Sequence, residues 1–227
     1  MGALSVPIAN SNDYRQITGT FVVTAAGEFL PMQLIYQGKT TRCHPKFDFP
    51  DGFEVTHSEN HWSNKEKAIS LIENIILPYV ERTKERLDLP EEQKWIVIKD
   101  VFKGQWTENV KTTISDNNGM MTPVPANMTN HFQPLDLSTN RSCKALLKKE
   151  AQQWYASQVS DQLNNDVDQD HIKVDLKISN LKPLHAKWMT KFYDFIRCNP
   201  AIVMSGWKKA GITASMREEI VTDDPFN

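Results

Sequence analysis

Two aspartates that follow apolar segments are the residues best suited to chemistry in this sequence. Asp100 ends the run from Lys94 to Asp100, and Asp136 ends the run from Gln133 to Asp136, with 35 residues between the two aspartates. Hard cations such as Mg²⁺ prefer oxygen ligands, a few from protein carboxylates and the rest from water and phosphate. If Asp100 and Asp136 lie together, they are candidate ligands for metal-assisted cleavage of a phosphodiester.

Both aspartates also have a purely structural interpretation. An isolated aspartate after a strand often caps a turn. Asp136, which closely follows Pro134, also suits the first turn of a helix, where the helix dipole favours a negative charge. The residue types alone leave this alternative open for both positions.

The segments around the two aspartates predict how they would be positioned. The continuous apolar run 95–98 predicts a strand buried on both faces, as in a parallel or mixed sheet. Residues 120–124 predict a further short strand, and a long helix begins at about Leu135. Because sites in open α/β sheets lie at the carboxyl ends of strands, we expect Asp100 and Asp136 to converge at one sheet edge.

The first part of the chain predicts a β-hairpin followed by a loop. Residues 16–24 and 29–36 are rich in β-branched and aromatic residues, and a turn at 26–28 joins them. Residues 40–62 show no hydrophobic period and predict a long ordered loop, of the kind that often borders a site.

Helical spacing dominates most of the remaining chain. Ser63 and Glu66 have the spacing of a capping box, and the helix after them extends to about Leu87, with Pro78 expected to kink it. Further helices are predicted at 106–115, from 135 to about 160, at 180–197 and at 200–209, with an acidic linker at 161–175. The order of elements predicts an α/β fold with a mixed sheet and flanking helices.

The composition is that of an ordinary globular protein without a strong charge bias. The 227 residues carry a net charge of −2, so any surface that binds nucleic acid must be local. Cys43, Cys143 and Cys198 are too few and too far apart for a disulfide framework, which fits a reducing compartment. The N-terminus has no signal-peptide pattern, and no apolar run is long enough to span a membrane.

Two other sets of residues could bind ligands, and each has a simpler interpretation. His57 and His61 have helical spacing but lie in a segment without a helical pattern, and Cys43 and His44 are distant in sequence, so ordinary loop histidines are favoured over a zinc site. Lysines on the predicted helices could bind DNA phosphates, but core tryptophans with solvated lysines are favoured for most of them. These lysines are Lys144, Lys148, Lys149, Lys182, Lys187, Lys191, Lys208 and Lys209, and they lie near Trp154, Trp188 and Trp207.

Several segments resemble the DDE superfamily endonuclease domain of pogo/Tigger-type, centromere-protein-B-like transposases. They are residues 15–21, 27–40, 96–100, 124–136 and 205–212. The most specific is the block Val124–Asp136, which is similar to the family pattern P-x-N-x-T…Q-P-L-D. The resemblance implies a ribonuclease H-like fold, a nuclear location, DNA as partner, and Mg²⁺ or Mn²⁺ held by Asp100 and Asp136 as the second and third catalytic carboxylates.

One part of the family pattern has no counterpart here. In the family the first catalytic aspartate lies on a central strand before the hairpin, in a D-E-T-like segment, and a helix-turn-helix region precedes it. Only 13 residues precede Tyr14, and neither Asp13 nor Glu28 is at the family position. The resemblance therefore implies a sheet without its first central strand and weak or absent metal binding.

The resulting prediction has three segments and two candidate functions. Residues 1–13 are a loop or disordered, 14–212 form a partial DDE-type catalytic domain, and 213–227 are a disordered tail. The first function is metal-dependent DNA strand cleavage and transfer; the alternative is an inactive, domesticated module that binds DNA or protein. The sequence leaves open whether the gene model is truncated and whether the chain forms a homodimer.

Overall fold

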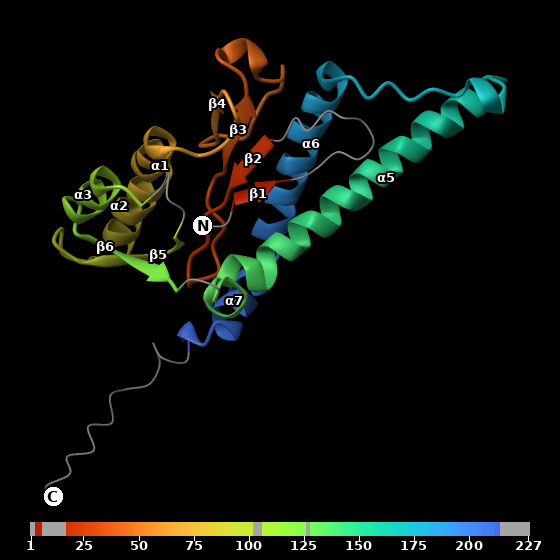
Figure 1. The fold of residues 1–227 in the computed structure, drawn as a ribbon. Helices are drawn as coiled ribbons and strands as arrows, with labels where there is room; N and C mark the ends of the chain where they lie inside the picture. The colour runs from red at the N-terminus through yellow and green to blue at the C-terminus, as the bar shows by residue number, and fades with distance from the viewer. Residues whose placement is uncertain (1–2, 6–16, 102–105, 126–127, 214–227) are drawn as a thin grey trace, which may run out of the picture.

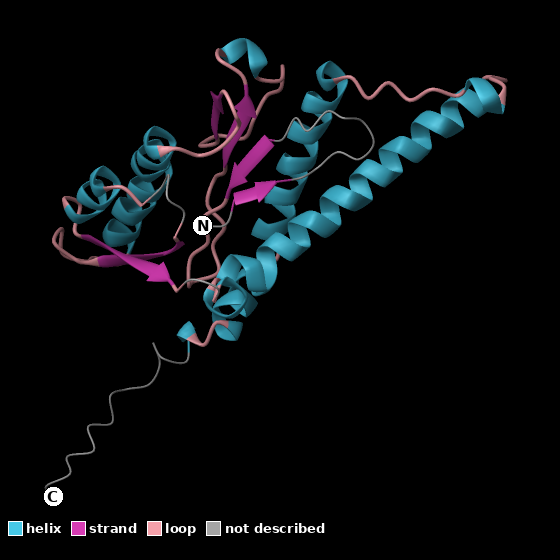
Figure 2. Ribbon diagram, viewed as in Figure 1, coloured by secondary structure: helices cyan, strands magenta, loops and turns pink. Residues whose placement is uncertain are grey.

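The computed structural model describes residues 3–5, 17–101, 106–125 and 128–213. It contains two small sheets with helices packed around them, a mixed α/β fold (Figures 1 and 2). This confirms the predicted fold class. The predicted tail at 214–227 and most of the predicted N-terminal loop lie outside the described residues.

A four-stranded sheet is built around the predicted hairpin. Its strands, in spatial order, are β1 (Ala3–Ser5), β2 (Ile17–Thr20), β3 (Gln33–Gln37) and β4 (Glu54–Ser58). The β2 and β3 strands pair antiparallel, with Ile17 opposite Tyr36, which confirms the hairpin. Both strands are shorter than predicted, and beyond them only an isolated bridge joins Val23 to Phe29.

Two strands lie where the sequence predicted loops. The β4 strand falls inside the predicted loop 40–62 and pairs parallel with β3. All five of its residues are half-buried, so neither face of the strand is a buried apolar face that the sequence pattern could have revealed. The β1 strand falls inside the predicted loop 1–13 and pairs antiparallel with β2. In both cases the pairing partner, rather than the local pattern, makes the strand.

The second sheet contains only β5 (Trp95–Asp100) and β6 (Gly119–Val124), which run parallel. In the described part of the chain no backbone pairing joins it to the four-stranded sheet. The prediction that β5 is buried on both faces is wrong, because Ile96 is 60% exposed and its register partner Met120 is 52% exposed. The outer face of β5 is therefore open to solvent at Ile96.

The helix after β4 contains a wide turn just before Pro78, the residue expected to kink it. It consists of α1 (Lys65–Leu71), a π-helical turn (Ile72–Ile76) and α2 (Leu77–Arg86). Its N-cap is Asn64, whose side chain accepts a hydrogen bond from the Lys67 N–H at 3.0 Å, so the cap lies one residue after the predicted Ser63. Pro78 has no N–H to donate, and the π turn directly before it accommodates the missing bond.

The later helices largely follow the prediction. They are α3 (Glu108–Ser115), α4 (Thr129–Phe132), α5 (Asn140–Asn164), α6 (Ile178–Arg197) and α7 (Pro200–Lys209). A π turn at Leu135–Thr139 leads into α5, which continues into the predicted acidic linker. In Figure 1, α5 extends away from the body of the molecule, while α6 lies against the β2–β3 hairpin.

The main core forms where α6 packs on the hairpin. Phe192 from α6 lies 5.5 Å from both Phe21 and Phe29, measured between ring centroids, and Tyr193 lies 5.7 Å from Phe29. A second core lies between α1, the π turn, α3 and the inner face of β5, where Trp95 packs. Each sheet therefore has its own layer of helices.

A close helix contact fixes the turn that precedes α5. Gly206 of α7 faces Pro134 and Ser138, and a Cβ atom at position 206 would overlap the Pro134 carbonyl oxygen and lie 2.5 Å from Ser138 Oγ. The Ser138 hydroxyl donates to the same carbonyl at 3.1 Å. Only glycine permits this approach, so α7 determines where the Asp136 turn lies.

We expect Gly206→Ala to lower the free energy of unfolding by about 1 to 3 kcal/mol, the usual cost of overpacking. Alanine is the better helix former, so a gain in stability would contradict the close contact. Urea denaturation is the measurement. Ser205→Ala, on the same helix and outside this contact, is the control and should change stability little.

Candidate functional site

Asp100 is the last residue of β5 and is half-buried. Its register partner is Val124, the last residue of β6. Side chains alternate along a strand, so Ile98 and Asp100 share a face, and Ile98 packs against the core cluster that includes Leu135. By this alternation Ile96, Ile98 and Asp100 share the outer face of β5, which is open to solvent at Ile96 and half-buried at Ile98 and Asp100.

Asp136 lies in the π turn that leads into α5. The Asn140 side-chain amide donates to Asp136 Oδ1 at 2.5 Å, and Asn140 itself is 5% exposed. The Asp136 N–H donates to the Gln133 carbonyl at 3.1 Å. A carboxylate held at the start of a 25-residue helix is favoured by the helix dipole, and π turns are frequent at functional sites.

Asp100 lies at the carboxyl end of the two-stranded sheet, and the turn that carries Asp136 follows β6 in the chain after α4. Figure 1 shows the carboxyl end of β6 directed toward the beginning of α5, and Asp100 lies beside that end of β6. The expected convergence of the two side chains at this edge stays a prediction. Their joint role as metal ligands stays a prediction.

The donor set at this edge suits one hard cation better than two. Two carboxylates with water and substrate phosphate are a sufficient set for Mg²⁺. Among the described residues, however, no group of three metal-ligating side chains includes Asp100 or Asp136. Glu28 is engaged elsewhere, 3.4 Å from Arg86 and 3.5 Å from the Tyr79 hydroxyl, and Asp13 lies outside the described residues.

Lys99, next to Asp100, was not anticipated as a feature of the site. It is 1% exposed, and by alternation it shares the inner face of β5 with Trp95 and Val97. In the described part of the chain its ammonium has no ion pair or hydrogen bond. Burial lowers the pKa of Lys99 to about 8, because the charged form loses its hydration.

A basic pocket of about 530 Å³ lies between α2, the hairpin turn and the end of α6. Arg82, Arg86 and Arg197 line it together with Tyr79 and Tyr193. The Arg197 guanidinium lies 5.2 Å from the centroid of the Tyr193 ring. Sequence reasoning missed this pocket because the arginines come from helices far apart in the chain.

The histidines are arranged neither as a His57–His61 zinc site nor as isolated loop residues. His61 Nδ1 lies 3.2 Å from Thr18 Oγ1, so His57 and His61 do not form a pair. His57 Nδ1 instead lies 3.1 Å from His44 Nε2, and Cys43 is beside them. Distance in sequence was therefore a poor guide here, because the β3–β4 pairing brings the two segments together.

The interpretation of the tryptophans as core residues is confirmed. Trp188 and Trp207 are 8% and 9% exposed, and Trp154 contacts Trp188 edge-on at 6.5 Å between centroids. The Lys191 ammonium pairs with Glu150 at 2.5 Å, which joins α6 to α5. In addition, no helix in the described ranges combines the length and the apolar character needed to cross a membrane.

Comparison with known proteins identified the family of the chain. The family model described as DDE superfamily endonuclease matches residues 15–199, a range that contains both Asp100 and Asp136. No curated protein and no solved structure matched the chain.

We expect Lys99→Met to stabilise the protein near neutral pH and to change its pH dependence. The folded-state pKa of Lys99, about 8, is below its unfolded value of 10.5, so the unfolded chain binds more protons between these values. The stability of the unsubstituted protein must therefore rise with pH across that window. The variant should be more stable by up to about 3 kcal/mol below pH 8, and the difference should vanish near pH 10.5.

Urea denaturation from pH 7 to 10.5 measures this difference. Lys94→Met, an exposed lysine directly before β5, is the control for loss of a positive charge. Equal stability of Lys99→Met and the unsubstituted protein at pH 7 would show that the buried ammonium is already compensated.

Proposed function

Because the chain belongs to the DDE superfamily endonuclease family, we propose that it is a transposase-derived domain that binds DNA and cleaves its phosphodiester backbone. The observation that carries the proposal is the family match over residues 15–199, a range in which Asp100 ends a parallel strand and Asp136 lies in the turn that leads into α5. The mixed α/β fold agrees with a nuclease-like domain of this family.

The assignment of the chain to one branch of the family rests on the residues around Asp136. Gln133, Pro134, Leu135 and Asp136 reproduce the Q-P-L-D pattern of the pogo/Tigger-type, centromere-protein-B-like branch, and we assign the chain to that branch. A nuclear location follows from DNA as the substrate. The ribonuclease H-like arrangement, without a first central strand, belongs to the same proposal.

Domains of this family generally depend on a divalent metal, and Asp100 and Asp136 are the residues that would hold it. When bound, Mg²⁺ or Mn²⁺ would supply the activation of water and the stabilisation of the leaving oxygen. Asn140 is a positioning residue, because its amide fixes the Asp136 carboxylate through the 2.5 Å hydrogen bond. The Gly206 contact with the Asp136 turn adds a second support.

The basic pocket supplies a means of binding the DNA backbone. Arg82, Arg86 and Arg197 outnumber Glu28, the acidic residue of the pocket lining, so the pocket carries excess positive charge. Arginine binds phosphate oxygens with two parallel hydrogen bonds. Tyr79 and Tyr193 add hydroxyl groups and aromatic faces that also suit nucleic acid.

A second function is favoured by one specific observation. Within the described ranges no third carboxylate joins Asp100 and Asp136, and a two-metal centre needs more ligands than these two provide. We therefore keep a module that binds DNA without cleaving it as the alternative proposal.

For the cleavage function, we expect nicking of plasmid DNA with Mg²⁺ or Mn²⁺, and a rate at least about 100-fold lower in Asp100→Asn and in Asp136→Asn. The amide keeps the shape but removes the charge that holds the cation. Gel analysis of supercoiled plasmid is the measurement, and Asp116→Asn, an exposed residue after α3, is the control.

The same assay separates the two functions. Metal-dependent nicking that persists in both variants would contradict the assigned role of the aspartates. If the unsubstituted chain binds DNA but does not nick it with either metal, the binding module is the correct function. An in-frame D-E-T-like segment directly upstream in the genome would favour the enzyme.

For DNA binding, we expect Arg82→Gln and Arg197→Gln to weaken affinity for a duplex and to reduce its salt dependence. Each phosphate contact contributes about 0.9 to the slope of log affinity against log salt for B-DNA. Fluorescence anisotropy over a salt series measures both quantities. Arg42→Gln, exposed and outside the pocket, should leave affinity and slope unchanged; equal effects from all three substitutions would exclude a specific role for the pocket.

A further inference from the structure

Cys43, His44 and His57 form a compact group of metal-ligating side chains. One ligand atom from each residue lies within 4.8 Å of the other two, and His44 Nε2 is 3.1 Å from His57 Nδ1. Cys43 and His44 lie at the end of a short 3₁₀ helix, Thr41–Cys43, and His57 lies on β4. All three residues are half-buried, so they are shielded but accessible to an ion.

The fold brings the group together through the parallel pairing of β3 and β4. That pairing places His57 beside Tyr36, and the Gly38 N–H donates to the Ser58 carbonyl at 2.9 Å. After β3 the chain turns back so closely that a Cβ atom on Gly38 would lie 2.7 Å from Cys43 Sγ. The Cys43 side chain therefore has little freedom to move away from the histidines.

A contact from α6 supports the same turn. The Lys182 ammonium donates to the Cys43 carbonyl oxygen and lies 5.7 Å from the centroid of the Tyr36 ring. The turn that carries two of the three candidate ligands is thus fixed to the sheet on one side and to a core helix on the other.

We propose that Cys43, His44 and His57 bind a zinc ion through one thiolate and two imidazole nitrogens. In a tetrahedral zinc site, bond lengths of about 2.0–2.1 Å to nitrogen and about 2.3 Å to sulfur place two nitrogens about 3.3 Å apart and nitrogen and sulfur about 3.6 Å apart. The His44–His57 separation of 3.1 Å is close to this value, and all three atoms are within 4.8 Å of one another. Small side-chain rotations complete the geometry, and the thiol proton of Cys43 is released as the ion binds.

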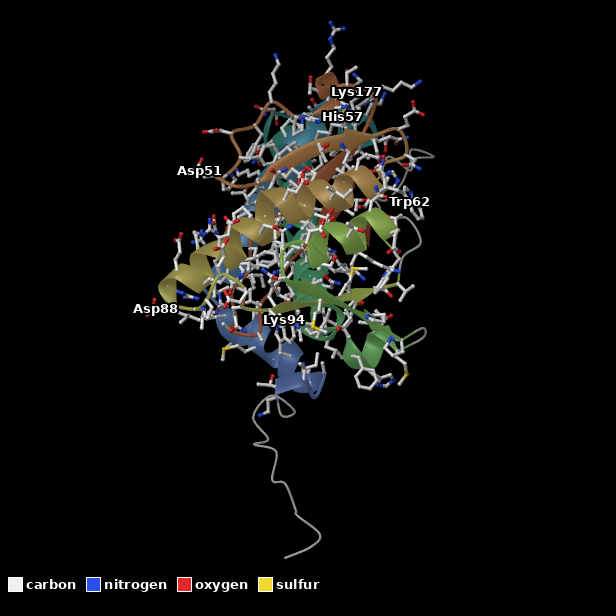
Figure 3. All side chains as sticks on the ribbon, turned by 90° about the vertical axis from the view of Figure 1, so that its left-hand side faces the viewer. Asp51, His57, Trp62, Asp88, Lys94 and Lys177 are labelled. Carbon is white, nitrogen blue, oxygen red and sulfur yellow. The ribbon has the colours of Figure 1, made fainter. Side chains whose placement is uncertain are left out.

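The ligand chemistry distinguishes this site from the aspartate pair. Thiolate and imidazole ligands favour Zn²⁺, whereas carboxylates favour Mg²⁺ and Mn²⁺. The two locations are also separate: Figure 3 shows His57 near one end of the molecule and Lys94, directly before β5, toward the other. The proposal is therefore independent of DNA cleavage.

Three protein ligands leave the fourth zinc position for water or another donor. Bound to residues 43, 44 and 57, the ion ties the segment between β3 and β4 to the edge strand β4. Binding free energy that depends on the folded arrangement becomes folding free energy, so the bound ion stabilises this part of the fold.

The test uses the full 227-residue chain and Zn²⁺ alone, added to metal-free protein in competition with a chromophoric chelator. We expect one zinc ion per chain, and an affinity at least about tenfold lower in Cys43→Ser and in His57→Gln. Cys198→Ser is the control: Cys198 is exposed and lies about 24 Å along α6 from Lys182, at 1.5 Å per residue. It should bind zinc as the unsubstituted protein does.

Two further readouts keep the proposal testable if a variant folds poorly. Co²⁺ in place of zinc should give a tetrahedral visible spectrum with a thiolate charge-transfer band in the unsubstituted protein and in Cys198→Ser. Zinc should raise the melting temperature of these two proteins but not that of Cys43→Ser or His57→Gln. Circular dichroism of the metal-free variants shows whether they are folded.

The results that would overturn the site are equally specific. They are absence of stoichiometric zinc binding, equal affinity in Cys43→Ser and the unsubstituted protein, or a cobalt spectrum without the thiolate band. Retained zinc binding in Asp100→Asn and Asp136→Asn would show that the site survives even if the cleavage proposal fails.

Discussion

In the described part of the molecule, the β5–β6 strand pair that carries Asp100 is joined to the rest of the fold by side-chain packing rather than by backbone pairing with the other sheet. The β5–β6 pair has no backbone ladder to the four-stranded sheet, so the inner-face residues Trp95 and Val97 attach it to one core and Ile98 to the other. Asp136, by contrast, lies in a turn locked between α7 and Asn140. The separation of the two carboxylates therefore depends mainly on how firmly β5 packs.

Lys99 adds an electrostatic constraint to the same strand. At pH 7 it places a buried positive charge directly after the apolar run and directly before Asp100. Burial favours loss of that proton, whereas an anion bound near the strand end would favour keeping it. Packing and charge thus make different demands on β5 at Lys99.

Locally encoded elements were predictable from the sequence, and elements created by distant pairing were not. The β2–β3 hairpin follows from its β-branched runs and a turn at Gly27, where φ is +93°, and α6 follows from its apolar stripe. The β4 strand and the Cys43–His57 proximity depend on parallel pairing with β3, for which no local pattern exists. The arginine pocket likewise requires the folded arrangement of α2 and α6.

The candidate site shows the same division. The apolar run before Asp100 and the residues around Asp136 were sufficient to nominate both aspartates and to predict the strand that ends at Asp100. The exposure of Ile96 was not predictable, because it depends on which strands are present to cover β5. The burial of Lys99 escaped notice for a similar reason: a lysine in a strand is usually solvated.

The length of α5 has a dynamic consequence. The helix spans about 37 Å, at 1.5 Å per residue, yet its buried residues, Asn140, Cys143 and Leu147, all lie in its first third. Farther along, α5 is attached by the Glu150–Lys191 ion pair and the Trp154–Trp188 contact, and at its far end by the paired hydrogen bonds between Gln162 and Lys173. Amide hydrogen exchange should consequently quicken along the helix from base to tip, with the base opening only when the whole domain unfolds.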